Sequence, residues 1–275
     1  IRQRIDLGSD TYAHGKISNE KIDDLCHTLK EFAQIMESYK VTAYKAYGTS
    51  AIRETENTLI LQDQIEQRTG IWVETLSNSE QRFLDYKSIA SKGETFRRII
   101  EEKTAILDIG GGSIQISLFD KDTLVSTQNL RLGVLRLQEL LNHLNAGSTQ
   151  MERLVDELAT AQLDDYKKLY LKDREIKNII IVDDYLSPWA VRKAHERGEV
   201  NAVVDRKAFS QLMEALRTKG TTELAKRMDI AEEKVPLVYI SAILTRRIAE
   251  LMGAELVWAP GVTPVSYTHL RAHET

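Results

Sequence analysis

The segment with the clearest chemical potential runs from Asp108 through three glycines to Ser113. A carboxylate at the end of an apolar strand leads into a glycine turn, whose backbone N–H groups can surround phosphate oxygens without interference from side chains. Residues 114–119 then alternate like a strand, whereas a dinucleotide-binding turn leads into a helix and a P-loop ends in a lysine. The pattern indicates a phosphate-binding hairpin, although an ordinary glycine-rich hairpin has the same composition.

Three further segments accompany this hairpin in the first half of the chain. In sequence order the four segments are 48–57, 76–82, 108–113 and 132–137. In order and spacing they resemble the exopolyphosphatase/guanosine pentaphosphate phosphohydrolase (Ppx/GppA) family, and the second half of the chain resembles it more loosely. The resemblance implies an α/β chain with the two-domain actin/sugar-kinase/heat-shock-ATPase-like (ribonuclease H-like) fold.

The resemblance also implies roles for two carboxylates. Glu80 falls where the family has its catalytic glutamate, a base for the attacking water, and Asp108 falls where it has an aspartate that holds Mg²⁺ or the water. Hydrolysis of a phosphoanhydride needs an oriented water and relief of charge on the transferred phosphoryl group. Mg²⁺ suits such a site because it needs few protein carboxylates. From the local sequence alone, Glu80 is better explained as an acid favoured by a helix N-terminus.

Phosphate ligands are predicted among three arginines and the hairpin. Arg53 matches the family's phosphate-facing arginine, and a planar guanidinium can bind two phosphate oxygens at once. Arg82 and Arg136 also match family positions, but surface ion pairs explain them equally well. The hairpin residues that match the family are Gly110, Gly111, Gly112 and Ser113.

Three features depart from the family pattern. The family opens with a first phosphate hairpin of the Asp-x-Gly-Ser type, and no such motif precedes Ile1, so we expect the first domain to lack its start. Gln115 stands where the family usually has a glutamate, and an amide cannot supply a negative metal ligand. The acidic turn at 183–185 replaces a glycine-threonine turn, and its acids either form an Asx turn or add carboxylates to the cleft.

Alternating strand and helix patterns must position these residues. The pattern in the first part of the chain predicts helices over 22–36, 60–68 and 79–90 and strands over 41–47 and 72–76. The second part predicts strands over 104–108, 114–119, 123–129, 176–182 and 255–258 and helices over 134–144, 150–161, 206–216, 222–228 and 237–251. The charged segment 92–103 suits an exposed connection, which places the domains at 1–103 and 104–263.

Composition limits the class of protein. The chain has 275 residues, 42% of them hydrophobic, and a formal net charge of -4, which gives no overall attraction to nucleic acid. Its single cysteine, Cys26, excludes an internal disulfide and fits a packing role in a reducing compartment. No apolar run approaches the roughly 20 residues that cross a bilayer. We therefore expect a cytoplasmic protein without nucleic-acid or membrane partners; a homodimer remains open.

The predicted function is hydrolysis of terminal phosphoanhydride bonds, with inorganic polyphosphate or the guanosine penta/tetraphosphate alarmone as substrate. Two alternatives stay open. One is a polyphosphate or nucleotide sensor that has lost activity, as Gln115 permits. The other is an ATP-dependent kinase of the same superfamily, against which the missing glycine-rich adenosine-binding turn argues. The last stretch, 264–275, has no helical or alternating period and is predicted to be foreign to the protein.

Overall fold

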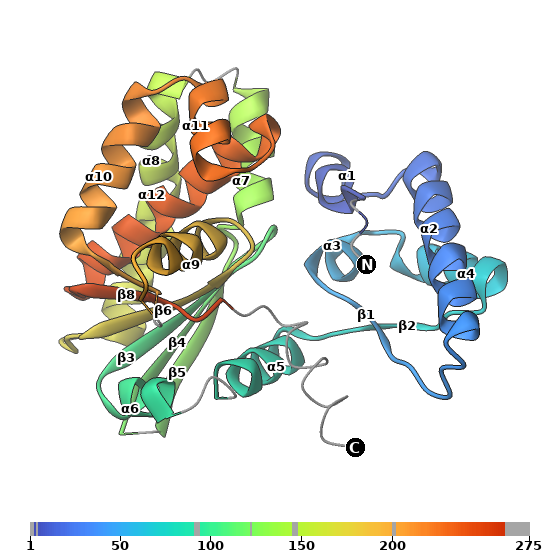
Figure 1. Ribbon diagram of the computed structural model, residues 1–275, viewed down its shortest axis with the longest axis horizontal. Helices are drawn as coiled ribbons and strands as arrows, with labels where there is room; N and C mark the ends of the chain where they lie inside the picture. Colours follow the sequence, from blue (N-terminus) through green and yellow to red (C-terminus); the bar gives the residue numbers. More distant parts are fainter. Residues whose placement is uncertain are drawn as a thin grey trace. The chain divides into compact units, whose positions relative to one another are not determined.

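The computed structural model describes residues 3, 5–90, 94–121, 123–144, 148–199 and 202–261 (Figure 1). The chain forms two compact units, Ile1–Gln81 and Arg82–Thr275, whose border falls within helix α5 (Asn78–Ala90). The predicted border lies later, at 103, after a segment expected to be an exposed connection. That segment contains helix α6 (Glu94–Glu101), in which Phe96 and Ile99 are buried. The tail predicted to be foreign lies outside the described residues.

The first unit is mostly helical and contains one pair of short parallel strands. Its elements, in order, are α1 (Leu7–His14), α2 (Asn19–Ser38), β1 (Ala46–Gly48), α3 (Ser50–Glu54), α4 (Thr58–Thr69) and β2 (Val73–Thr75). Helix α2 begins after Ser18, whose side chain caps it by accepting from Lys21 N, and Cys26 is buried in the core that α2 shares with α4. Both strands are shorter than predicted, because Tyr44 and Trp72 are exposed and lie outside the strand pairing.

The second unit is built on a six-stranded sheet with the order β5-β4-β3-β6-β8-β7. The strands are β3 (Thr104–Ile109), β4 (Ile114–Asp120), β5 (Thr123–Leu130), β6 (Asn178–Asp183), β7 (Ala202–Asp205) and β8 (Leu256–Ala259). Strands β3, β6 and β8 are parallel to one another, and the other pairs are antiparallel. The three predicted hairpin strands and the two predicted later strands are confirmed, whereas β7 was not predicted.

Helices of the second unit include every one predicted there. After α5 and α6 they are α7 (Val134–His143), α8 (Ser148–Tyr166), α9 (Leu186–Glu196), α10 (Arg206–Thr218), α11 (Thr221–Met228) and α12 (Val235–Met252). A π-helical turn at Lys167–Leu171 and a 3-10 turn at Glu232–Lys234 complete the list. Helix α12 ends at Gly253, whose φ of 71° gives the left-handed cap expected of glycine. Among the described helices, none is both long and apolar enough to cross a membrane.

The sheet of the second unit separates two cores, because successive residues of a strand point to opposite faces. Leu107 of β3 belongs to the larger core, which α7 to α12 cover. Ile106 faces the other way and packs with Phe119 and with residues of α5 and α6. Tyr86 of α5 meets Phe119 edge to face, with ring centroids 5.2 Å apart. Helices α5 and α6 therefore cover the second face.

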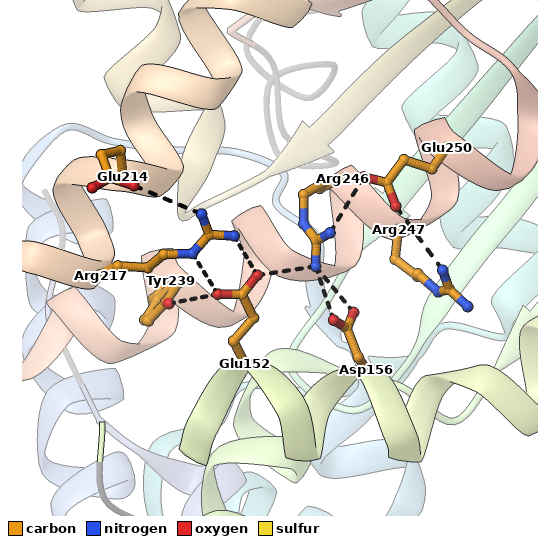
Figure 2. Close-up of polar contacts among 8 residues, drawn as sticks. All are labelled: Glu152, Asp156, Glu214, Arg217, Tyr239, Arg246, Arg247 and Glu250. Atoms are coloured by element: carbon orange, nitrogen blue, oxygen red, sulfur yellow. Dashed lines mark hydrogen bonds and ion pairs between the residues drawn. The ribbon is translucent and has the colours of Figure 1, made fainter. Parts of the chain in front are cut away.

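An ion-pair network joins three helices of the larger core (Figure 2). Glu152 of α8 accepts two hydrogen bonds from Arg217 of α10, at 2.7 and 2.6 Å, and one from Tyr239 of α12 at 3.1 Å. Arg246 of α12 lies 2.9 Å from Asp156 and 3.2 Å from Glu152. Hydrogen bonds from Arg217 hold the pKa of the Glu152 carboxyl below its ordinary value. The network ties α8 to α10 and α12.

Candidate functional site

The carboxyl ends of β1 and β2 bring together two predicted site residues of the first unit. The strands run parallel and end at paired positions, Gly48 and Thr75. Arg53, on the helix after β1, donates from Nη1 to the carbonyl oxygen of Leu76 at 2.6 Å. Glu80 lies on the helix that follows β2. Loops at this edge of parallel strands are the usual ligand sites of α/β proteins.

Glu80 closes a capping box at the start of α5. Its Oε2 accepts from the N–H of Ser77 at 2.8 Å, and the Oγ of Ser77 accepts from the N–H of Glu80 at 3.2 Å. Hydrogen bonds from Ser77 lower the pKa of the exposed Glu80 carboxyl, so it is ionised at neutral pH. These contacts are those of an acid at a helix start, and the role of base stays a prediction. Because Arg53 and Glu80 are bound to the consecutive residues Leu76 and Ser77, both side chains are fixed at one strand end.

Helix α7 shapes the glycine turn between β3 and β4. The carbonyl oxygens of Gly110, Gly111 and Gly112 accept from Val134 N, Arg136 N and Arg136 Nε at 3.0, 3.0 and 2.9 Å. A trans peptide directs its carbonyl and the following N–H to opposite sides. The N–H groups of Gly111, Gly112 and Ser113 therefore point away from α7. Such an arrangement can accept phosphate oxygens, as the sequence predicts.

Glycines let the hairpin and α7 approach closely. A Cβ on Gly133 would lie 2.2 Å from the carbonyl carbon of Gly112, and a Cβ on Gly111 would lie 2.9 Å from Cδ1 of Leu135. Neither Gly111 nor Gly133 has a positive φ. These positions thus need glycine for space and not for a left-handed backbone.

The two other predicted arginines lie in the second unit. Arg136 holds the hairpin from the α7 side through its Nε and its backbone N–H, and its contact with phosphate stays a prediction. Arg82 is half-buried on α5 near Tyr86. Burial raises the pKa of Tyr86 to about 12, although the charge of Arg82 opposes this shift. Arg136 is thus part of the packing around the hairpin, while the role of Arg82 stays a prediction.

A carboxylate that the sequence analysis did not single out lies beside Asp108. Asp85, on α5, is 1% exposed, and apart from the Asp108 carboxyl its carboxylate oxygens have no hydrogen-bond partner among the described residues. Burial and the neighbouring Asp108 carboxylate raise the pKa of Asp85 well above its ordinary value. A single aspartate in a helix gives no signal of this kind in sequence, since such residues are mostly solvated.

Asp85, Asp108 and Gln115 form a small set of oxygen donors that fits Mg²⁺. Asp108 and Gln115 are directly opposed in the pairing of β3 with β4, so their side chains share one face of the sheet. Within the described part of the chain, no group of three or more His, Cys, Asp or Glu side chains is suited to a metal. Two carboxylates and an amide nevertheless fit Mg²⁺, which fills its shell with water and phosphate oxygens. The unsatisfied oxygens of Asp85 are the observation that favours a cation here.

Asp183, in the acidic turn after β6, is a structural cap. Its Oδ2 accepts from Leu186 N at 2.7 Å and from Ser241 Oγ at 2.8 Å, and its Oδ1 accepts from Ser187 N at 2.6 Å. Burial raises the pKa of this carboxyl, while the hydrogen bonds act to lower it. Its backbone donors lie three and four residues on, beyond the two residues of an Asx turn, so Asp183 has a structural role of a related kind. The carboxylate fixes the start of α9 and binds α12.

Replacing Asp183 with alanine is expected to lower the free energy of unfolding by about 3 kcal/mol or more, because buried donors left without an acceptor cost roughly 1–3 kcal/mol each. Thermal and urea unfolding would measure the loss. Asp205→Ala is the matched control, since exposed Asp205 caps α10 through one hydrogen bond, from Ala208 N at 2.7 Å. That control is expected to cost about 1 kcal/mol. Equal losses for the two variants would contradict the structural role of Asp183.

A pocket of about 440 Å³ opens in the second unit between β7, α10 and α12. None of the predicted site residues lines it. Its arginines Arg217 and Arg246 bind Glu152 and Asp156, so their charges already serve the ion-pair network (Figure 2). The pocket is therefore not part of the candidate site.

Comparison with known proteins places these features in a family context. The model of the Ppx/GppA phosphatase family matches residues 1–257. Exopolyphosphatase 1 of Mycobacterium tuberculosis is 31% identical over 112 residues, which are 40% of this chain and 31% of the relative. A bifunctional 3-dehydroquinate synthase/phosphatase of Fusobacterium nucleatum is 24% identical over 174 residues, 60% of this chain and 26% of the relative. Each match thus spans less than a third of the relative's length.

Solved structures show the same fold. An exopolyphosphatase from Cytophaga hutchinsonii superposes with a TM-score of 0.74 at 19% identity, over 98% of this chain and 88% of that one. A Ppx/GppA family member from Aquifex aeolicus superposes with a TM-score of 0.72 at 16% identity, over 100% and 90% of the two chains. At these identities the likeness shows the fold alone. The predicted fold class is confirmed.

Proposed function

Because the chain belongs to the Ppx/GppA phosphatase family, we propose that it hydrolyses the terminal phosphoanhydride bond of inorganic polyphosphate. The observation that carries the proposal is the turn at 110–112, whose three carbonyls are held by α7 so that the following N–H groups point outward. The mycobacterial relatives named exopolyphosphatase support the choice of substrate. The guanosine penta/tetraphosphate alarmone is the second proposed substrate, since it offers the same type of bond.

In the proposed reaction, water attacks the terminal phosphorus and the bond to the bridging oxygen breaks, which releases orthophosphate and a chain one unit shorter. Glu80, ionised at neutral pH, accepts the proton of the attacking water. Arg53 and the hairpin N–H groups bind the phosphoryl oxygens, where fixed donors stabilise developing charge. Asp108 would hold Mg²⁺, which supplies positive charge beside the phosphoryl oxygens when bound.

One observation favours a non-catalytic sensor as the second candidate. Gln115 lies directly opposite Asp108, where the family resemblance leads us to expect a glutamate. A site with one negative ligand fewer would bind metal more weakly while the hairpin still bound phosphate. The two candidates therefore differ in their rate of phosphate release and not in their binding of polyphosphate.

Orthophosphate release in the presence of Mg²⁺ tests the proposal, with polyphosphate, guanosine pentaphosphate and ATP as parallel substrates. We expect release from polyphosphate, and the ratio to the pentaphosphate gives the preference between the two proposed substrates. Binding of polyphosphate without release from any of the three would support the sensor. Transfer of phosphate from ATP to an acceptor other than water would support a kinase instead.

A further inference from the structure

Asp85 is held in a position that is unfavourable for a lone carboxylate. A buried charge without hydrogen-bond donors or an opposite charge is strongly destabilising. Asp85 is 1% exposed, and apart from the carboxyl of Asp108 its oxygens have no hydrogen-bond partner in the described part of the chain. Its carboxylate neighbour, Asp108, adds repulsion if both groups are ionised. A cation or a proton between the two carboxyls would relieve the unfavourable burial of Asp85.

The packing of α5 fixes Asp85 over the end of β3. Ile89, one helical turn after Asp85, packs in the same core as Ile106, which is two residues before Asp108 on the same face of the strand. The packing of the helix on the strand therefore places Ile89 in one core with Ile106 and brings Asp85 next to Asp108. The two carboxyls meet because of this tertiary packing, at the strand end that leads into the phosphate hairpin.

Gln115 completes the local arrangement. It is 8% exposed and directly opposes Asp108 across the β3–β4 pair. Its amide oxygen can bind a cation but carries no charge, so Asp108 and Gln115 together supply one negative charge. We propose that Asp85 is a direct ligand of the divalent cation at Asp108 and supplies the negative charge that Gln115 does not. This inference rests on the proposed function for the choice of Mg²⁺, but its test does not depend on catalysis.

A titration with Mn²⁺ tests the ligand set without substrate. The paramagnetic resonance signal of the free ion measures how much Mn²⁺ is bound. Asp85→Asn is nearly isosteric and removes one charge, and we expect it to weaken Mn²⁺ binding by about tenfold or more, as loss of groups around metals commonly does. Asp108→Asn should weaken binding at least as much. Gln115→Glu adds a charge at the same place and should tighten binding in the parent.

Asp120→Asn is the matched control. Asp120 is the last residue of β4, at the opposite end of the strand from Gln115, and the substitution is equally isosteric. We expect this variant to bind Mn²⁺ like the parent. Thermal melting gives a second readout, since a cation that binds only the folded state raises the melting temperature. Mg²⁺ should raise the melting temperature of the parent and of Asp120→Asn, and raise that of Asp85→Asn much less.

Folding of the variant is tested by the same melts. The amide introduced by Asp85→Asn can donate to Asp108, so this variant is expected to melt without Mg²⁺ at or above the temperature of the parent. If it folds and binds Mn²⁺ as tightly as the parent, Asp85 is not a ligand and the carboxyl pair holds only a proton. The protein could bind Mn²⁺ in a way that depends on Asp85 and yet release no phosphate. That result would contradict the proposed hydrolysis and still support Asp85 as a ligand.

Discussion

Glu80→Gln is expected to lower phosphate release from polyphosphate by about a hundredfold or more, because a general base commonly contributes roughly 10² to 10⁴ in rate. The capping box makes this substitution informative. Glutamine at the same helix position can also accept from the N–H of Ser77, so α5 keeps its start. The loss should therefore fall on kcat, with KM and the melting temperature close to those of the parent.

Ser77→Ala separates chemistry from capping. It removes the hydroxyl that accepts from the N–H of Glu80 but leaves the carboxylate in place. We expect a stability loss of about 1 kcal/mol, measured by urea unfolding, and activity within several-fold of the parent. If Glu80→Gln retained activity within about threefold of the parent, Glu80 would be only a helix-capping acid, as its local sequence first indicates.

Strong apolar periodicity made much of the fold predictable. The face of α12 that begins at Leu237 and the buried strand from Thr104 need no tertiary information, and both lie where predicted. Helix α6 was missed because its charges suggest an exposed segment, although Phe96 and Ile99 stand three apart as on one helix face. Strand β7 has only four residues, too few for a periodic signal.

The candidate site was predictable only as far as its motifs reach. Arg53, Glu80 and the glycine hairpin stand in segments that resemble the family, and the structure shows how backbone groups fix them. Asp85 stands in no such pattern, since its importance arises where α5 packs on β3. The sequence allows two interpretations of the acidic turn at Asp183. The three donors from α9 and α12 show that this carboxylate has a structural role. Contacts between distant segments are what the sequence alone does not contain.

Gly133→Ala is expected to have the largest effect of any single methyl group added near the hairpin. The new Cβ would lie 2.2 to 2.3 Å from backbone atoms of Gly111, Gly112 and Ser113. Backbone cannot rotate away as a flexible side chain can, so the hairpin and the start of α7 must separate. Overpacking commonly costs about 1–3 kcal/mol and occasionally more, and we expect a loss at or above the upper end. Separation would also release the glycine carbonyls from α7 and misdirect the N–H groups. Polyphosphate affinity should therefore fall by about tenfold or more, which is a loss of about 1.4 kcal/mol in binding free energy.

Gly220→Ala is a closely matched control for this prediction. Gly133 and Gly220 are both N-cap residues with nearly the same backbone, φ -68° and ψ 151° in one and φ -68° and ψ 152° in the other. A Cβ on Gly220 would meet no atom within 4 Å. Replacement there changes only the cap preference, which is expected to cost less than about 1 kcal/mol and to leave polyphosphate binding unchanged. Unfolding curves and polyphosphate titrations of both variants give the comparison. Equal effects at the two glycines would mean that the close packing of α7 does not shape the hairpin, and the outward N–H groups would lose their structural explanation.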